Sequence, residues 1–285
     1  MSKNTVLDIQ NTVKSKGRIL DLTNPVVMGI LNATPDSFYN KGKGRDVDAM
    51  LHMAEKMIND GATILDIGGA TTKPGAQLIY PDEEMKRVMP AVEAIIKRFP
   101  DIWLSIDTYN APVAKATVEA GVMIVNDVSS GRFDATMLQT VAALKVPYIA
   151  MHMQGTPESM QKNPNYKDVV TEVLGYLHGI CNKAQEAGIT DIIIDPGFGF
   201  GKTVEHNFQL LRMMHTLRVL VKPVLAGLSR KSMICKTLNV SPEQALNGTT
   251  ALNMIALQQG ASILRVHDVK EAVETIKLFQ AINKI

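Results

Sequence analysis

The sequence predicts an α/β protein with one domain folded as a (β/α)8 TIM barrel, and three observations support this prediction. Short apolar runs alternate with amphipathic, helix-like segments about eight times along the chain. A glycine separates a helix-like segment from the next apolar run at Gly61, Gly121 and Gly260, and a left-handed residue commonly ends a helix. Polar residues follow nearly every apolar run, and in a barrel the carboxyl ends of the strands meet at one rim.

The apolar runs predict strands because they are short and apolar on both faces, as in a buried parallel sheet. In chain order the strands are expected near residues 26–31, 64–67, 103–106, 122–126, 147–151, 192–195, 224–227 and 263–266. Strict alternation with helices and right-handed crossovers favours a closed barrel over an open doubly wound sheet. Residues 17–22 are expected to form a small hairpin that closes the bottom of the barrel.

Helices are predicted between the strands from apolar stripes and end signals. The first carries Met50, Ala54 and Met57 on one face, and the second opens with Pro81 and an acidic first turn. Pro90 is expected to kink the second helix because proline removes a backbone donor. The predicted helices cover residues 46–60, a segment from Pro81, and residues 111–120, 134–144, 167–187, 204–216, 241–259 and 268–282.

Composition favours a single globular domain. The chain has 285 residues, of which 46% are hydrophobic, so a large core can be buried. Nothing resembling a linker divides it, so residues 1–285 are expected to form one barrel domain in which residues 1–16 are flexible or peripheral. A net charge of +2 gives no reason to expect a nucleic-acid or membrane partner. The chain lacks the features of a signal peptide or membrane span, so a cytoplasmic protein is expected.

Polar side chains at the predicted strand ends form the candidate site. Asp107, Asn126 and Asp195 offer acceptors that suit a heteroaromatic ring with several N–H donors. Cationic and hydroxyl residues at other strand ends suit a phosphate or diphosphate; these are Lys231, Arg265, His267, Thr71 and Thr72. Any one of them could instead cap a helix or order a turn. However, all of them follow strands, and in a barrel the carboxyl ends of the strands lie at one rim, which favours a common site.

The glycine-rich segment 197–203 is similar to a phosphate-binding loop. However, Pro196 stands where the first glycine of that motif belongs, which argues against a nucleotide site. The glycines are expected to let Phe198 and Phe200 present aromatic faces to a planar ligand, with packing of one phenyl under the loop as the alternative. The histidines lack zinc-binding spacing, whereas Asn32 beside a diphosphate is a candidate ligand for Mg²⁺, which needs few protein ligands.

Four longer motifs together resemble the dihydropteroate synthases. They are MGILNATPDSF at 28–38, DPGFGFGK at 195–202, GLSRKS at 227–232 and RVHD at 265–268. Shorter matches such as SIDT at 105–108 extend the resemblance over residues 17–282, in the family's order. The resemblance implies a transferase of folate biosynthesis, and a sulfonamide target, that joins 6-hydroxymethyl-7,8-dihydropterin diphosphate to 4-aminobenzoate.

The resemblance also implies Mg²⁺ as cofactor, a homodimer, and a set of site residues. The implied substrate-binding residues are Asn32, Phe38, Thr71, Thr72, Pro74, Asp107, Asn126, Met151, Asp195, Phe200, Gly227, Lys231, Ser232, Arg265 and His267. Among them Asp107, Lys231, Arg265 and His267 are implied as catalytic, and Asn32 as the metal ligand. The helix that starts after Ser232 would offer N–H groups to the aminobenzoate carboxylate.

The chain departs from the family pattern at two positions, and two other functions stay open. Ala70 and Lys73 stand where the family usually has Glu and Arg, so a bidentate guanidinium is lost. One alternative is a methyltetrahydrofolate-type pterin methyltransferase, which would not need the cluster of cationic residues. The other is a catalytically silent pterin-binding paralogue, which would be expected to have lost more polar residues at the rim.

Overall fold

The barrel consists of eight parallel strands in a computed structural model that describes residues 9–33, 45–71 and 75–283. The strands are β3 (Val26–Asn32), β4 (Ile64–Gly68), β5 (Trp103–Asp107), β6 (Ile124–Asp127), β7 (Tyr148–Met151), β8 (Ile192–Asp195), β9 (Leu225–Ala226) and β10 (Ile263–Val266). Their order is β8-β7-β6-β5-β4-β3-β10-β9. Ile194 bridges Val224 just before β9, and its N–H donates to the carbonyl oxygen of Pro223 at 2.9 Å. This contact joins the two edge strands, so the predicted barrel is confirmed.

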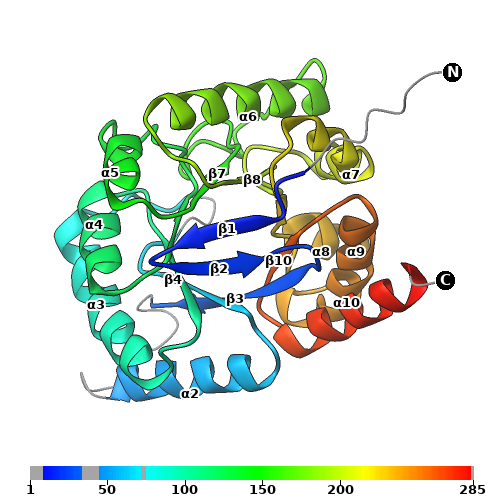
Figure 1. Cartoon of the computed structure of the whole chain (residues 1–285). Coiled ribbons are helices and arrows are strands. Elements are labelled where there is room, and N and C mark those ends of the chain that lie inside the picture. The colour runs from blue at the N-terminus through cyan, green and yellow to red at the C-terminus, as the bar shows by residue number, and fades with distance from the viewer. Residues whose placement is uncertain (1–8, 34–44, 72–74, 284–285) are drawn as a thin grey trace, which may run out of the picture.

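Helices surround the sheet (Figure 1). They are α2 (Arg45–Asn59), α3 (Pro81–Arg98), α4 (Ala111–Ala120), α5 (Met137–Leu144), α6 (Val169–Glu186), α7 (Val204–Arg212), α8 (Ser232–Leu238), α9 (Leu246–Gln258) and α10 (Val269–Asn283). Gly61, Gly121 and Gly260 have φ angles of +102°, +130° and +96°, as predicted for residues that follow helices. Within the described ranges, no helix is long and apolar enough to cross a bilayer.

Two predicted helices are in fact divided. The segment 204–216 contains α7 and then a 3-10 helix, η1 (Met214–Leu220). The segment 241–259 contains the short 3-10 helix η2 (Pro242–Gln244) before α9. The N–H of Ala245 donates to the carbonyl oxygen of Pro242, three residues back, at 3.3 Å, so this turn is a 3-10 helix and not the first turn of α9.

An antiparallel hairpin covers the amino-terminal end of the barrel and crosses the centre of the view in Figure 1. Its strands are β1 (Thr12–Ser15) and β2 (Arg18–Asp21), joined by Lys16 and Gly17. Both turn residues have positive φ, at 49° and 78°, as a tight hairpin turn requires. The predicted hairpin at 17–22 therefore begins earlier, and the described part of segment 1–16 includes a strand instead of being wholly flexible.

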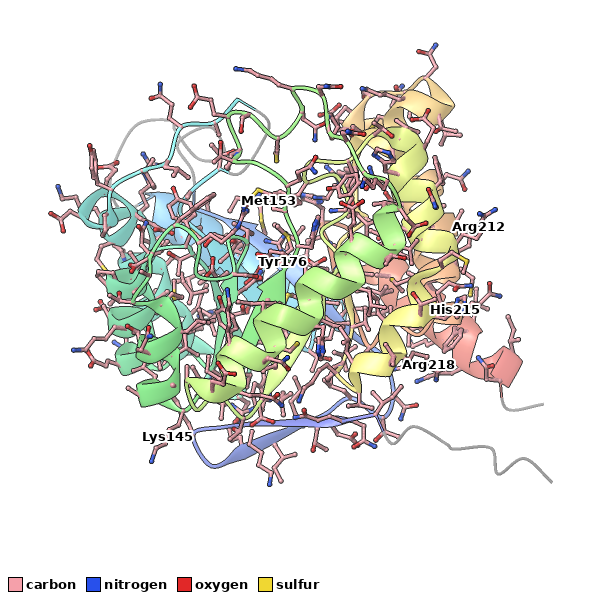
Figure 2. The ribbon with its side chains drawn as sticks, turned by 90° about the horizontal axis from the view of Figure 1, so that it is seen from above. Lys145, Met153, Tyr176, Arg212, His215 and Arg218 are labelled. Carbon is pink, nitrogen blue, oxygen red and sulfur yellow. The ribbon has the colours of Figure 1, made fainter. Side chains whose placement is uncertain are left out.

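The inward side chains of the strands form layers because residues alternate between the two faces of a strand. The lowest layer is apolar and packs on Val13 and Leu20 of the hairpin; it includes Met28, Ile64, Ile124, Ile149, Ile193 and Ile263. Two residues further along the same strands, the inward positions are polar or line the cavity described below; they include Asp66, Asn126, Met151, Asp195 and Arg265. In Figure 2 the hairpin lies along the lower edge, and Met153, just past β7, lies toward the opposite end. The apolar layer therefore seals one end and the site occupies the other.

Candidate active site

A cavity lies at the carboxyl ends of the strands, and most predicted site residues line it. The lining residues are Asp107, Asn126, Val128, Met151, Asp195, Phe198, Phe200, Gly227, Lys231 and Arg265. The cavity volume is about 20 Å³, which holds about one water molecule.

The guanidinium of Arg265 reaches between two carboxylates inside the barrel. Its Nε donates to Oδ2 of Asp66 at 2.6 Å, and its Nη2 donates to Oδ2 of Asp107 at 2.7 Å. The Nδ2 of Asn126 donates to the same Asp66 oxygen at 2.9 Å. Asp66 is fully buried, so it positions two predicted site residues from the layer below. The sequence reasoning did not include Asp66 in the site; the available signal was an acid two residues after Ile64 in a buried apolar strand.

Burial shifts the pKa values of three charged groups in the cavity, Asp107, Asp195 and Lys231, toward neutrality. It raises the pKa of Asp107 to about 7, although the nearby Arg265 opposes the shift. It also raises the pKa of Asp195, against a hydrogen bond that the Gly197 N–H donates to Oδ1 at 2.7 Å. It lowers the pKa of Lys231 to about 8, against the attraction of Asp195. Acids shifted up beside a cation shifted down are typical of functional sites.

The two phenyl rings of the glycine-rich loop have different environments. Phe198 is 1% exposed and belongs to the main core, although it also contributes to the cavity wall. Phe200 is half-buried, and the Nζ of Lys231 lies 4.3 Å from its ring centroid. A side chain on Gly199 would lie 3.2 Å from the Cδ of Lys231. The loop therefore presents Phe200 and Lys231 as one wall, while Phe198 anchors it.

Lys202 stabilises this loop from within. Its Nζ donates to the carbonyl oxygens of Gly197 at 2.8 Å and Phe200 at 3.1 Å. It also lies 2.9 Å from Nδ1 of His152, whose pKa burial lowers to about 2. Lys202 is 3% exposed and bonds the loop's own backbone, so it is not a phosphate-binding P-loop lysine. His152, one of the polar residues that end a strand, is therefore a neutral structural residue. The sequence did not predict that Lys202 holds the backbone of its own loop.

Lys231 and His267, two of the residues predicted to bind an anion, lie in the loops that follow β9 and β10. Arg230 donates from Nη2 to Oδ1 of Asp268 at 2.6 Å and from Nε to Oδ2 at 3.2 Å, which ties the two loops together. Ser229 Oγ lies 3.0 Å from Nδ1 of His267. His267 does not line the cavity itself, and burial lowers its pKa to about 4. The imidazole is therefore uncharged near neutral pH.

The remaining predicted residues lie around the rim or outside the described chain. Thr71 and Ser232 are exposed, and Ser232 is the first residue of α8. Phe38, Thr72 and Pro74 lie outside the described residues, as does Lys73. The cavity is thus lined by eight of the residues predicted to bind substrate.

Asn32 suits a metal that also binds the substrate. It is the last residue of β3, is half-buried, and makes no side-chain hydrogen bond with any residue that the structure describes. Its amide oxygen is a suitable ligand for Mg²⁺. This ion commonly needs one or two protein ligands beside phosphate oxygens. Among the described residues, no three acidic, histidine or cysteine side chains cluster to form a metal site. The residues present fit an ion shared with an anionic ligand.

Comparison with known proteins identifies the family. Residues 28–267 match the family model described as pterin binding enzyme. The dihydropteroate synthase of Escherichia coli K12 is 45% identical over 270 residues, covering 94% of this chain and 95% of the relative.

Solved structures agree with this match. The Yersinia pestis dihydropteroate synthase, described in complex with a sulfonamide drug, has a TM-score of 0.91 at 43% identity and covers 96% of this chain and 100% of its own. The Xanthomonas albilineans enzyme, described with 4-aminobenzoic acid, has a TM-score of 0.90 at 41% identity and covers 96% and 99%. The chain therefore belongs to the pterin binding enzymes, and among them to the dihydropteroate synthases.

Proposed function

We propose that this chain condenses 6-hydroxymethyl-7,8-dihydropterin diphosphate with 4-aminobenzoate, giving 7,8-dihydropteroate and pyrophosphate. The cavity supports this most directly, because it sets the acceptors Asp107, Asn126 and Asp195 against the cations Lys231 and Arg265. The relatives at 41–45% identity bear the name of this enzyme, and one is described with 4-aminobenzoic acid. The chain is accordingly a transferase that acts on small molecules.

The pterin ring is assigned to the polar layer of the barrel. Its N–H and amino donors would pair with the carboxylates of Asp107 and Asp195 and with the amide of Asn126, which also offers a donor. Met151 is buried in the cavity wall and would pack on a face of the ring. Buried acceptors of this kind discriminate strongly against rings without matching donors.

The diphosphate is assigned to the rim. Arg265 would meet it with the guanidinium N–H groups that Asp66 and Asp107 do not engage, and His267 with a neutral ring N–H, helped by Thr71 and Thr72. Mg²⁺, held by Asn32 together with diphosphate oxygens, would add positive charge that stabilises the leaving group. These residues would stabilise the negative charge that develops as the bond from the pterin methylene carbon to the diphosphate oxygen breaks.

Carboxylates of the chain would assist the attack of 4-aminobenzoate on the pterin methylene carbon. Asp107 would stabilise the positive charge that spreads from the methylene carbon into the ring. The aromatic amine of 4-aminobenzoate is already a neutral nucleophile, so it forms the new C–N bond without a strong base and then releases one proton. Phe200, Lys231 and Ser232 would shape its pocket, together with Phe38 and Pro74. Catalysis thus depends on positioning and charge stabilisation.

A homodimer in the cytoplasm completes the proposal. Large apolar side chains are exposed on α9 and α10, including Leu246, Ile255, Leu278 and Ile282, and surfaces of this kind commonly lie in interfaces. Light scattering of the purified protein should give twice the mass of the 31.1 kDa chain, and a monomer mass would refute the dimer.

The reaction itself is tested by following both products. Purified protein supplied with dihydropterin diphosphate, 4-aminobenzoate and Mg²⁺ should release dihydropteroate and pyrophosphate in equal amounts, and EDTA should stop both. Tight pterin binding without product would instead indicate a silent paralogue. Methyl transfer from methyltetrahydrofolate would indicate the methyltransferase alternative.

A further inference from the structure

His267 and Ser229 make two hydrogen bonds that involve the same hydroxyl oxygen. The backbone N–H of His267 donates to Oγ of Ser229 at 3.2 Å, and Nδ1 of the His267 ring lies 3.0 Å from the same atom. Ser229 is 5% exposed, so its hydroxyl is screened from bulk water. Both groups belong to loops at the rim, Ser229 after β9 and His267 after β10.

The direction of the second hydrogen bond follows from counting donors and acceptors. A backbone N–H only donates, so Ser229 Oγ accepts that bond and its own hydrogen needs an acceptor. In the part of the chain that the structure describes, the only hydrogen-bond acceptor paired with this hydroxyl is Nδ1 of His267. A proton on Nδ1 would leave the buried hydroxyl hydrogen unpaired, which costs roughly 1–3 kcal/mol.

The charges around the ring favour the same arrangement. Arg230, Arg265 and Lys231 all disfavour an added proton on His267, and Asp268 alone among its charged neighbours favours one. Asp268 is already engaged by the guanidinium of Arg230. A neutral ring has one N–H, so when Nδ1 accepts from Ser229 the hydrogen resides on Nε2.

The other ring nitrogen remains available to a ligand. Nε2 makes no hydrogen bond to any described residue, and it is not among the buried side-chain atoms that lack a partner. Within the described residues, Nε2 is therefore free to donate to a ligand at the rim.

We infer that Ser229 is a positioning residue that fixes His267 as the neutral Nε2–H tautomer, so that the ring donates to the departing diphosphate. This inference rests on the proposed function for the identity of the ligand, whereas the tautomer is a property of the free protein. A donor suits an anion, while the opposite tautomer would present a lone pair to it. Ser229 thus acts through His267 and need not touch substrate.

Nitrogen NMR of the histidine side chains tests the inference without requiring turnover. In free protein labelled with ¹⁵N-histidine near neutral pH, His267 should show an unprotonated Nδ1 and a protonated Nε2, with its signals assigned by their loss in His267→Asn. A protonated Nδ1, or a doubly protonated ring, would overturn the inference. The result is independent of whether the chain makes dihydropteroate, so the two proposals can fail separately.

Three variants separate positioning from mere support of the loops. Ser229→Ala should release the tautomer and weaken pyrophosphate binding roughly 10–100-fold, the effect of losing one hydrogen bond to a charged group. Ser229→Thr keeps a hydroxyl and should restore both the tautomer and most of the affinity. Arg230→Met breaks the ion pair that ties the same two loops but leaves the hydroxyl and ring in place, so it should keep the Nε2–H tautomer. Loss of the tautomer in Arg230→Met, or its retention in Ser229→Ala, would contradict a specific role of Ser229.

Discussion

At the scale of single residues, the site depends on ionisable groups whose pKa values are moved toward neutral pH by burial. Asp107 is the clearest case, since burial raises its pKa to about 7 while Arg265 acts in the opposite direction. The type and position of Asp107 were readable from the sequence, because it ends a strand. Its contacts with Arg265 depend on how strands distant in sequence meet, and sequence spacing does not give that.

This shift predicts how stability depends on pH. Between its ordinary pKa of about 4 and the raised value, Asp107 binds more protons in the folded than in the unfolded chain. The stability that this group contributes is therefore full below about pH 4 and is lost as the pH rises through about 7. Asp107→Asn stays neutral at every pH, so its free energy of unfolding relative to the wild type should rise over that interval. Urea unfolding at several pH values checks this, and a flat difference would contradict the assigned shift.

Residues beneath the site were harder to predict than residues in it. Asp66 receives hydrogen bonds from both Arg265 and Asn126, but in the sequence it reads as the polar end of an apolar run. Lys202 reads as the lysine of an imperfect phosphate-binding motif and is instead turned into its own loop. Both roles depend on which backbone and side-chain groups fold back on one another.

At the scale of elements, the loop between β8 and α7 is the most constrained part of the site. A side chain on Gly197 would lie 1.9 Å from the carbonyl oxygen of His152, so this backbone is pressed against the end of β7. The φ angle of +68° at Gly197 also favours glycine. The glycines of the motif therefore serve close packing of the loop, and the loop in turn positions Phe200.

Lys202→Met is predicted to disorder this loop while the other residues that line the cavity stay in place. The variant keeps the apolar stem but leaves the carbonyl oxygens of Gly197 and Phe200 without their donor, which should cost about 1–3 kcal/mol of stability. The KM for 4-aminobenzoate should rise more than the affinity for pyrophosphate falls, because Phe200 belongs to the aminobenzoate wall. Steady-state kinetics and urea unfolding measure both effects.

Gln161→Ala provides the matched control for this variant. Gln161 donates to the carbonyl oxygen of Gly199 in the same loop, but that bond is exposed to solvent. Its loss should change stability by no more than about 0.5 kcal/mol. Equal effects of the two substitutions would mean that the buried Lys202 amine stabilises the loop no more than the exposed Gln161 side chain does.

The elements themselves were predicted well where buried apolar runs defined them. All eight barrel strands occur close to the expected residues, because a strand buried on both faces has a clear composition. Helix boundaries failed where a 3-10 helix adjoins an α-helix, as η1 follows α7 and η2 precedes α9. Apolar periodicity continues across such a break, so it does not reveal the division.

At the scale of the whole molecule, the barrel separates stability from function. The apolar layer and the hairpin seal the amino-terminal end, while the charged cavity lies at the carboxyl ends of the strands. This division is general in barrels of this type. It explains why the sequence motifs cluster after strands and why the first inward positions of the strands are apolar.

Leu20→Ala tests the separation. Leu20 is 4% exposed and packs in the lowest layer with Val13 and Ile64, so the substitution should lower the free energy of unfolding by about 2–5 kcal/mol. The KM values of the folded variant should match those of the wild type. A marked change in KM with unaltered stability would show that the hairpin end communicates with the site.

The central claim is that the polar layer of the barrel binds a pterin ring through Asp195 and its neighbours. Calorimetric titration of a dihydropterin into the wild type and into Asp195→Ala tests it most directly, with circular dichroism to confirm that the variant is folded. Removing a buried acceptor from ring donors should cost several kcal/mol of binding free energy, while pyrophosphate affinity should change little. Unchanged pterin affinity in the folded variant would contradict the claim.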